Sequence, residues 1–201
     1  MKNELPIDHE QHPRRVSRRE LAQTLLSGLA AGALLPSLSP LHPVCGHLMN
    51  GAVLDSADEI LSTEGHQPSF LSESQFVSLE KLTEAIVPGS GKARSAAFID
   101  LLLKVDSEES RQAFVASLSA LDREAEKTFH KNLTALSDAQ WNDVLQAASA
   151  KDSAHHPHFQ NLKGWAVGAY YSSETGMREL GWTPDRVFPS FPVCTHAEAH
   201  S

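Results

Sequence analysis

Two capping-box motifs constrain the fold of this chain more than any other feature of its sequence. Ser72-Glu73-Ser74-Gln75 and Ser137-Asp138-Ala139-Gln140 each place a serine three residues before a glutamine. Such a pair satisfies two otherwise unbonded backbone amides at a helix start. In the segment that follows the first motif, apolar side chains recur at helical spacing, at Phe76, Leu79, Leu82 and Ile86. Pro88-Gly89 ends this segment. This pattern predicts an amphipathic helix.

Further helical segments follow. The run over 96–105 is apolar apart from Asp100 and Lys104. A buried strand also fits this length, but the Leu and Ala content of the run favours a central helix buried on most sides. Ser107, with two glutamates after it, predicts a helix start, and that helix extends to about Lys131. The second capping box opens a fourth helix, 155–171 form a fifth, and 173–180 form a short final turn. We therefore predict an all-α protein: a single small bundle of about five helices.

The chain after residue 180 has a different character. From Gly181 it is irregular, and three prolines alternate with Phe188 and Phe191. Such a segment cannot form a core of its own, so its aromatic side chains need a surface on which to pack. That surface is either the bundle or a partner chain, and we predict an extended apolar C-terminal tail.

The N-terminal segment has the features of an export leader. The motif Ser17-Arg18-Arg19-Glu20-Leu21 precedes a long uncharged stretch. No Asp, Glu, Lys or Arg lies between Glu20 and Asp55, and residues 21–35 are mostly apolar. The pair Arg18 and Arg19, which follows Ser17 and lies shortly before Leu21, predicts a twin-arginine signal. Such a signal directs the export of folded proteins, so we also predict a periplasmic location. The apolar run is shorter than the roughly 20 residues of a membrane-spanning helix. A permanent anchor, or a core helix preceded by a basic turn, remains an alternative.

The leader suggests a division of the chain. Val44-Cys45-Gly46 offers a fair cleavage site before His47, which gives a signal over 1–46, a linker over 47–71 and a helical domain over 72–201 with its tail from 181. The formal net charge of −8 disfavours nucleic acid as a partner, because such binding needs clustered Lys and Arg.

The two cysteines of the chain are Cys45 and Cys194. Cleavage after Gly46 would leave Cys194 as the single thiol of an exported protein, which suggests an intermolecular bond or a reactive thiol. Earlier cleavage would allow an internal Cys45–Cys194 disulfide. An intermolecular bond, an internal bond and a free thiol all stay open.

The sequence carries no catalytic or cofactor motif that we can identify. His155, His156 and His158 lack the paired spacing of a zinc site and are better explained as a solvated cluster at a helix start. The segment Pro88-Gly89-Ser90-Gly91-Lys92 lacks the first glycine of a phosphate loop and is better explained as a helix stop. We predict no catalytic, cofactor-binding or metal site in this chain, and a binding or accessory role.

Several segments together resemble the small subunit (subunit 3, or gamma subunit) of gluconate 2-dehydrogenase-type complexes. The resemblance covers about Gln75 to His196, and the long segment before the arginine pair and the long linker depart from the usual pattern. The segments that carry the resemblance are Leu82–Pro88, Ala96–Asp100, Gly168–Glu174, Arg178–Trp182 and Cys194-Thr195-His196.

The resemblance implies a role in a complex. A large flavoprotein subunit of the glucose-methanol-choline (GMC) type carries FAD and oxidises a sugar, sugar acid or polyol, and electrons pass to a cytochrome c subunit or another acceptor. The small subunit has no cofactor of its own; it assists maturation of the flavoprotein and its export through the twin-arginine translocase. An exported binding module or chaperone without a dehydrogenase partner is the alternative.

The resemblance also assigns candidate residues. Cys194 matches the terminal cysteine of the family pattern and becomes a candidate for a disulfide to the catalytic subunit. The polar and aromatic stretch around the last turn is a candidate partner surface, although its residues could equally cap the bundle. The candidate interface residues are Tyr170, Tyr171, Arg178, Trp182, Phe188 and Phe191.

Overall fold

The structure, a computed structural model, describes Val44 and residues 67–181. In that part of the chain it consists of six α-helices and one 3₁₀ turn, with no strand. The elements are α3 (Glu73–Ile86), α4 (Ser95–Val105), α5 (Glu108–Phe129), η3 (Leu133–Ala135), α6 (Asp138–Ser149), α7 (His156–Tyr171) and α8 (Glu174–Glu179). The all-α prediction is confirmed for the described residues, and the expected final turn is the helix α8. The tail from 182 and, apart from Val44, the leader lie outside them.

The helix starts follow the sequence signals. Ser72 and Ser137 each accept a hydrogen bond from the backbone amide three residues on, and the glutamine at that position accepts from the serine amide, so both capping boxes are complete. Ser107 accepts from the amide of Ser110 at the start of α5. The start of α4 differs, because Arg94 there adopts a left-handed conformation and provides no side-chain cap. Short polar side chains thus define three of the longer helices.

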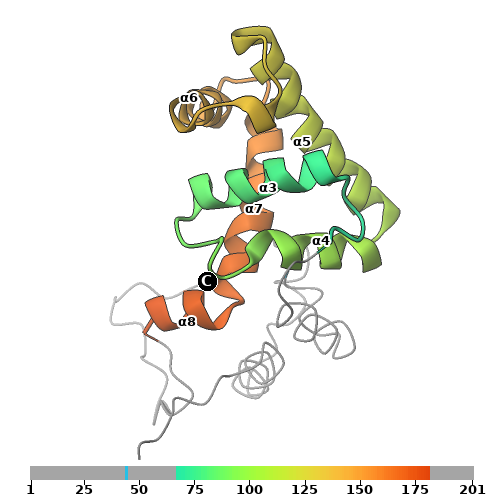
Figure 1. The fold of residues 1–201 in the computed structure, drawn as a ribbon, viewed down its shortest axis with the longest axis vertical. Coiled ribbons are helices and arrows are strands. Elements are labelled where there is room, and N and C mark those ends of the chain that lie inside the picture. The colour runs from blue at the N-terminus through green and yellow to red at the C-terminus, as the bar shows by residue number, and fades with distance from the viewer. Residues whose placement is uncertain (1–43, 45–66, 182–201) are drawn as a thin grey trace, which may run out of the picture.

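Helix α7 is the centre of the bundle. It packs against α3, α4, α5, α6 and α8, and Figure 1 shows it passing behind α3 with α6 near one end and α8 at the other. Its buried side chains lie on one face, and Trp165 meets Phe114 of α5 edge-to-face, with ring centroids 5.7 Å apart. Such an aromatic pair adds about 0.5–1.5 kcal/mol beyond the area it buries.

Helix α4 is buried on most sides, as its apolar sequence predicts. Phe98, Ile99, Leu102 and Leu103 are fully buried, and the alternative of a strand is excluded. Asp100 is fully buried as well, on this otherwise apolar helix. A buried carboxylate is costly unless hydrogen bonds compensate it.

The compensation for Asp100 comes from the segment just before α3. One oxygen, Oδ2, accepts from the amide and the hydroxyl of Ser69 at 2.6 and 2.9 Å. The other, Oδ1, accepts from the amides of Phe70 and Leu71 at 3.1 and 2.8 Å. We call residues 69–71 the strap. Although the sequence places them in a linker, Asp100 binds them to the domain.

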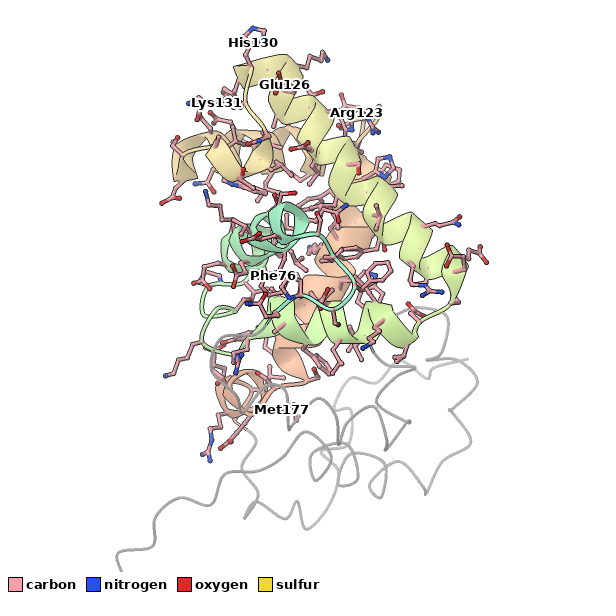
Figure 2. The ribbon with its side chains drawn as sticks, turned by 45° about the vertical axis from the view of Figure 1, so that its right-hand side comes forward. Phe76, Arg123, Glu126, His130, Lys131 and Met177 are labelled. Atoms are coloured by element: carbon pink, nitrogen blue, oxygen red, sulfur yellow. The ribbon has the colours of Figure 1, made fainter. Side chains whose placement is uncertain are left out.

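The two ends of the bundle differ in character. Figure 2 shows Arg123, Glu126, His130 and Lys131 gathered at the far end of α5, while Met177 marks α8 at the opposite end. Met177 is buried there, whereas Leu180 just after α8 is 65% exposed. None of the helices in the described part of the chain is long and apolar enough to cross a membrane.

Candidate partner interface at the α7–α8 end

The junction of α7 and α8 is held in a single tight geometry. Ser173 donates its hydroxyl to the Tyr170 carbonyl at 2.6 Å and accepts from the amide of Gly176 at 3.1 Å. A Cβ on Gly176 would lie 2.4 Å from the same carbonyl oxygen. Only glycine fits against the end of α7 at this position, and α8 therefore leaves α7 at a fixed angle.

Tyr170 anchors this junction from inside. Its side chain is fully buried and packs with Val87 and Ala93 of the connection between α3 and α4. A Cβ on Gly89 would lie 3.3 Å from its hydroxyl. Tyr170 was a candidate for the partner surface, but its ring contacts this domain instead, which is the capping role that the sequence left open.

The Tyr170 hydroxyl lies in an unusual setting. It is buried and makes no hydrogen bond of ordinary geometry within the described part of the chain. Burial raises the pKa of Tyr170 to about 12, and the nearby carboxylate of Glu179 contributes to that rise. Both effects disfavour the phenolate, so the hydroxyl stays protonated at physiological pH.

Three side chains at this end remain available on the surface. Tyr171 is half-buried and stacks edge-on against Tyr170, with centroids 5.1 Å apart. Arg178 is exposed and binds Glu174 through Nε and Nη2, at 2.9 and 2.6 Å. Leu180 is 65% exposed. We call Tyr171, Arg178 and Leu180 the α8 surface. Tyr and Arg are enriched at protein interfaces, and exposed Leu180 adds an apolar group beside them.

The remaining candidate residues lie outside the described part of the chain. They are Trp182, Phe188, Phe191 and Cys194 of the tail, and Ser17, Arg18, Arg19 and Leu21 of the leader.

The turn after α3 is a helix stop, as predicted. Glu84 accepts from the amides of Gly89 and Gly91, both at 2.8 Å. These two hydrogen bonds stabilise the carboxylate and hold the pKa of Glu84 below its ordinary value. Gly89 has a φ of 95°, which favours glycine. The amides that a phosphate would need are already bound to a carboxylate of the chain.

The three histidines before and within α7 serve local structure. In the described residues, no group of three or more His, Cys, Asp or Glu side chains is arranged to hold a metal ion. Each ring instead has a hydrogen-bond partner on a neighbouring segment: His155 with Glu124 at 3.2 Å, His156 with the Ser149 carbonyl at 3.0 Å, and His158 with Ser117 at 3.2 Å. These contacts join the start of α7 to α5 and α6.

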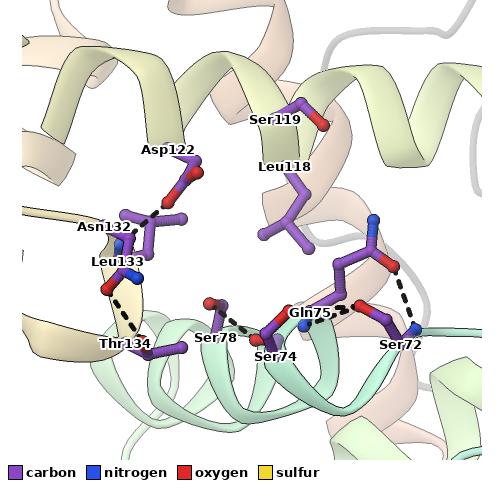
Figure 3. Close-up of a pocket in the computed structure, with 10 residues that line it drawn as sticks. All are labelled: Ser72, Ser74, Gln75, Ser78, Leu118, Ser119, Asp122, Asn132, Leu133 and Thr134. Carbon is purple, nitrogen blue, oxygen red and sulfur yellow. Dashed lines mark hydrogen bonds between the residues drawn. The ribbon is translucent and has the colours of Figure 1, made fainter. Parts of the chain in front are cut away.

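A polar cleft of about 280 Å³ lies between α3, α5 and η3. Figure 3 shows that its lining groups bind one another: Asp122 accepts from the Leu133 amide at 2.8 Å, and Gln75 and Ser72 complete their capping box. Asn132 accepts from Thr134 and caps the 3₁₀ turn. Hydrophilic side chains thus close the starts of α3 and η3 here, which gives the cleft a structural role.

The described geometry defines a small helical domain in which buried polar groups fix internal junctions and one end presents the α8 surface. The family model for gluconate 2-dehydrogenase subunit 3 matches residues 73–187. The chain therefore belongs to the gluconate 2-dehydrogenase subunit 3 family, which confirms the resemblance identified from its sequence. Comparisons with curated proteins and with solved structures gave no match.

The family match begins at the first residue of α3 and runs beyond the end of α8. The name of the family implies membership of a multi-subunit gluconate dehydrogenase complex. The segments 1–46 and 47–71 both lie before the match, which covers the described helices.

Proposed function

We propose that this chain is the non-catalytic small subunit of a periplasmic, FAD-dependent dehydrogenase complex that oxidises a sugar, sugar acid or polyol. The family match over the helical domain carries this proposal. In it, a GMC-type flavoprotein binds the FAD and the substrate, and a cytochrome c subunit is a further partner. The small subunit assists maturation of the flavoprotein.

The export part of the proposal rests on the leader. A flavoprotein folds around its cofactor in the cytoplasm, and a pathway for folded proteins can then carry it across the membrane. Arg18 and Arg19, within the Ser17–Leu21 motif, would supply the signal for both subunits. A flavoprotein without its own signal would travel bound to this chain.

Co-purification tests the complex. A tag on this chain should recover a large flavoprotein, seen by its mass and by its flavin absorbance. Recovery of the small chain alone from its native host would refute the complex and favour a stand-alone binding module.

Fractionation tests the export role. Replacing Arg18 and Arg19 with lysine should leave both the small chain and the flavoprotein in the cytoplasm, while the two still co-purify. A flavoprotein that reaches the periplasm beside this variant would show that it does not depend on the small subunit for export.

The α8 surface is our candidate for the contact with the flavoprotein. Exposed Leu180 and Val105 allow a matched comparison, because Val105 is 51% exposed on α4. Leu180→Ser should reduce recovery of the flavoprotein by tenfold or so, since an apolar side chain buried at an interface contributes about 1.5 kcal/mol or more. Val105→Ser should leave recovery unchanged, and equal effects of both variants would exclude the α8 surface.

A disulfide from Cys194 to the flavoprotein is a separate expectation. The complex should then migrate as a covalent species on a non-reducing gel and separate on reduction, and Cys194→Ser should abolish that species. An identical migration with and without reductant would rule out the bond.

A further inference from the structure

Val44 lies inside the folded domain, although the sequence assigns it to the leader. Its side chain is fully buried. It belongs to the same continuous apolar cluster as Leu79 of α3, Leu102 of α4 and Phe114 of α5. Val44 lies far before the first described helix in the sequence. Its burial in the apolar cluster therefore means that the helical domain encloses its side chain.

The strap gives a second attachment of the chain that precedes α3. Besides the four hydrogen bonds to Asp100, Leu71 is buried in the same cluster as Val44. Phe70 packs against that cluster, and the guanidinium of Arg111 lies 5.8 Å from the centre of its ring. The chain before α3 is therefore tied to the domain at two places, Val44 and the strap.

We propose that Val44 is part of the mature folded unit, so that a leader peptidase cuts on the N-terminal side of Val44 rather than after Gly46. The reference to a peptidase rests on the proposed export function. A protein exported through the twin-arginine pathway is folded before it meets the peptidase. Proteases cut chain that is exposed and poorly ordered. A cut after Gly46 would first require Val44, two residues away, to leave the core.

The inference changes the cysteine content of the mature protein. Cys45 directly follows Val44, so it remains in the chain together with Cys194. A mature protein with both cysteines could form either an internal Cys45–Cys194 disulfide or a disulfide to the partner. A cut after Gly46 would remove Cys45 and with it the internal disulfide.

The N-terminus of the exported protein tests the proposal directly. Protein purified from the periplasmic fraction should give an intact mass and an N-terminal sequence that include Val44. A mature chain beginning at His47, or anywhere after Val44, would overturn the proposal.

The stability of the full chain gives an independent test that does not depend on export. Val44→Ala removes buried apolar groups and should lower the equilibrium constant for folding roughly tenfold or more in urea titrations. Val105→Ala makes the same chemical change at an exposed position and should alter that constant by about twofold or less. Equal effects would overturn the burial of Val44. If the chain instead stays in the cytoplasm, the export proposal fails, while this comparison still decides the position of Val44.

Discussion

Asp100→Asn should detach the strap while it preserves the shape of the side chain. The carboxylate receives two backbone amides on Oδ1, and one amide and one hydroxyl on Oδ2. Asparagine keeps one acceptor oxygen and replaces the other with an NH₂ group, which is a donor. If the remaining oxygen faces Phe70 and Leu71, the NH₂ group faces the amide of Ser69, and two donors then oppose each other.

The magnitude follows from this count of donors. The Ser69 hydroxyl can rotate to accept from the new NH₂ group, so one backbone amide loses its acceptor, at a cost of about 1–3 kcal/mol. The hydrogen bonds that remain also lose the strengthening given by a charged acceptor, which is worth about 1 kcal/mol. We therefore expect Asp100→Asn to lower the free energy of unfolding by about 2–4 kcal/mol.

Urea denaturation followed by circular dichroism measures that loss, and hydrogen exchange of the amides of residues 69–71 locates it. These amides should exchange much faster in Asp100→Asn than in the parent chain. Asp143→Asn, an exposed position on α6, is the matched control and should change stability by less than about 0.5 kcal/mol. A similarly small effect of Asp100→Asn, with the strap amides still protected, would refute the role of Asp100.

Three further predictions concern the α7–α8 end, and a fourth concerns the turn after α3. Gly176→Ala should destabilise the domain by about 2 kcal/mol or more in the same urea assay, because its Cβ would lie 2.4 Å from the Tyr170 carbonyl oxygen. Tyr170→Phe should be neutral or stabilising by up to about 1 kcal/mol at pH 7, because the buried hydroxyl makes no hydrogen bond of ordinary geometry within the described part of the chain. The parent chain should also lose stability as the pH rises from about 10 through about 12, since the raised pKa of Tyr170 favours the neutral folded form, and Tyr170→Phe should remove this loss. The amides of Gly89 and Gly91 lower the pKa of Glu84. The contribution of Glu84 to stability is therefore complete above about pH 4.5 and is lost as the pH falls below that value. In Glu84→Gln, the free energy of unfolding should fall less steeply as the pH is lowered through the acid range.

The helices were predictable because their signals are local. The serine and glutamine of each capping box lie three residues apart, and the apolar spacing after them repeats within a single helix. The burial of α4 was predictable for a similar reason, because apolar residues on almost every side leave no face for water. These features require no knowledge of the partners across the bundle.

The roles of Asp100 and Tyr170 were not predictable in the same way. The partners of Asp100 lie about 30 positions earlier in the chain. Besides the Ser69 hydroxyl, the groups that it binds are backbone amides, which leave no mark on the sequence. An isolated acidic residue in an apolar helix was the one available signal. Tyr170 shares a sequence stretch with half-buried Tyr171 and exposed Arg178. Only the packing of the α3–α4 turn against α7 shows that Tyr170 is the buried member of this stretch.

The central position of α7 has a consequence for the order of events during synthesis. The leader is the first part of the chain to leave the ribosome, whereas the helix that contacts α3, α4, α5, α6 and α8 is nearly the last. At about 5–20 residues per second, translation from the end of the leader to the end of α7 takes on the order of 6–25 s. During that interval α3, α4, α5 and α6 lack α7, the helix that each of them contacts in the finished domain. Under the proposed export function, the signal would therefore leave the ribosome before the domain is complete, and export of the folded protein would follow the synthesis of α7.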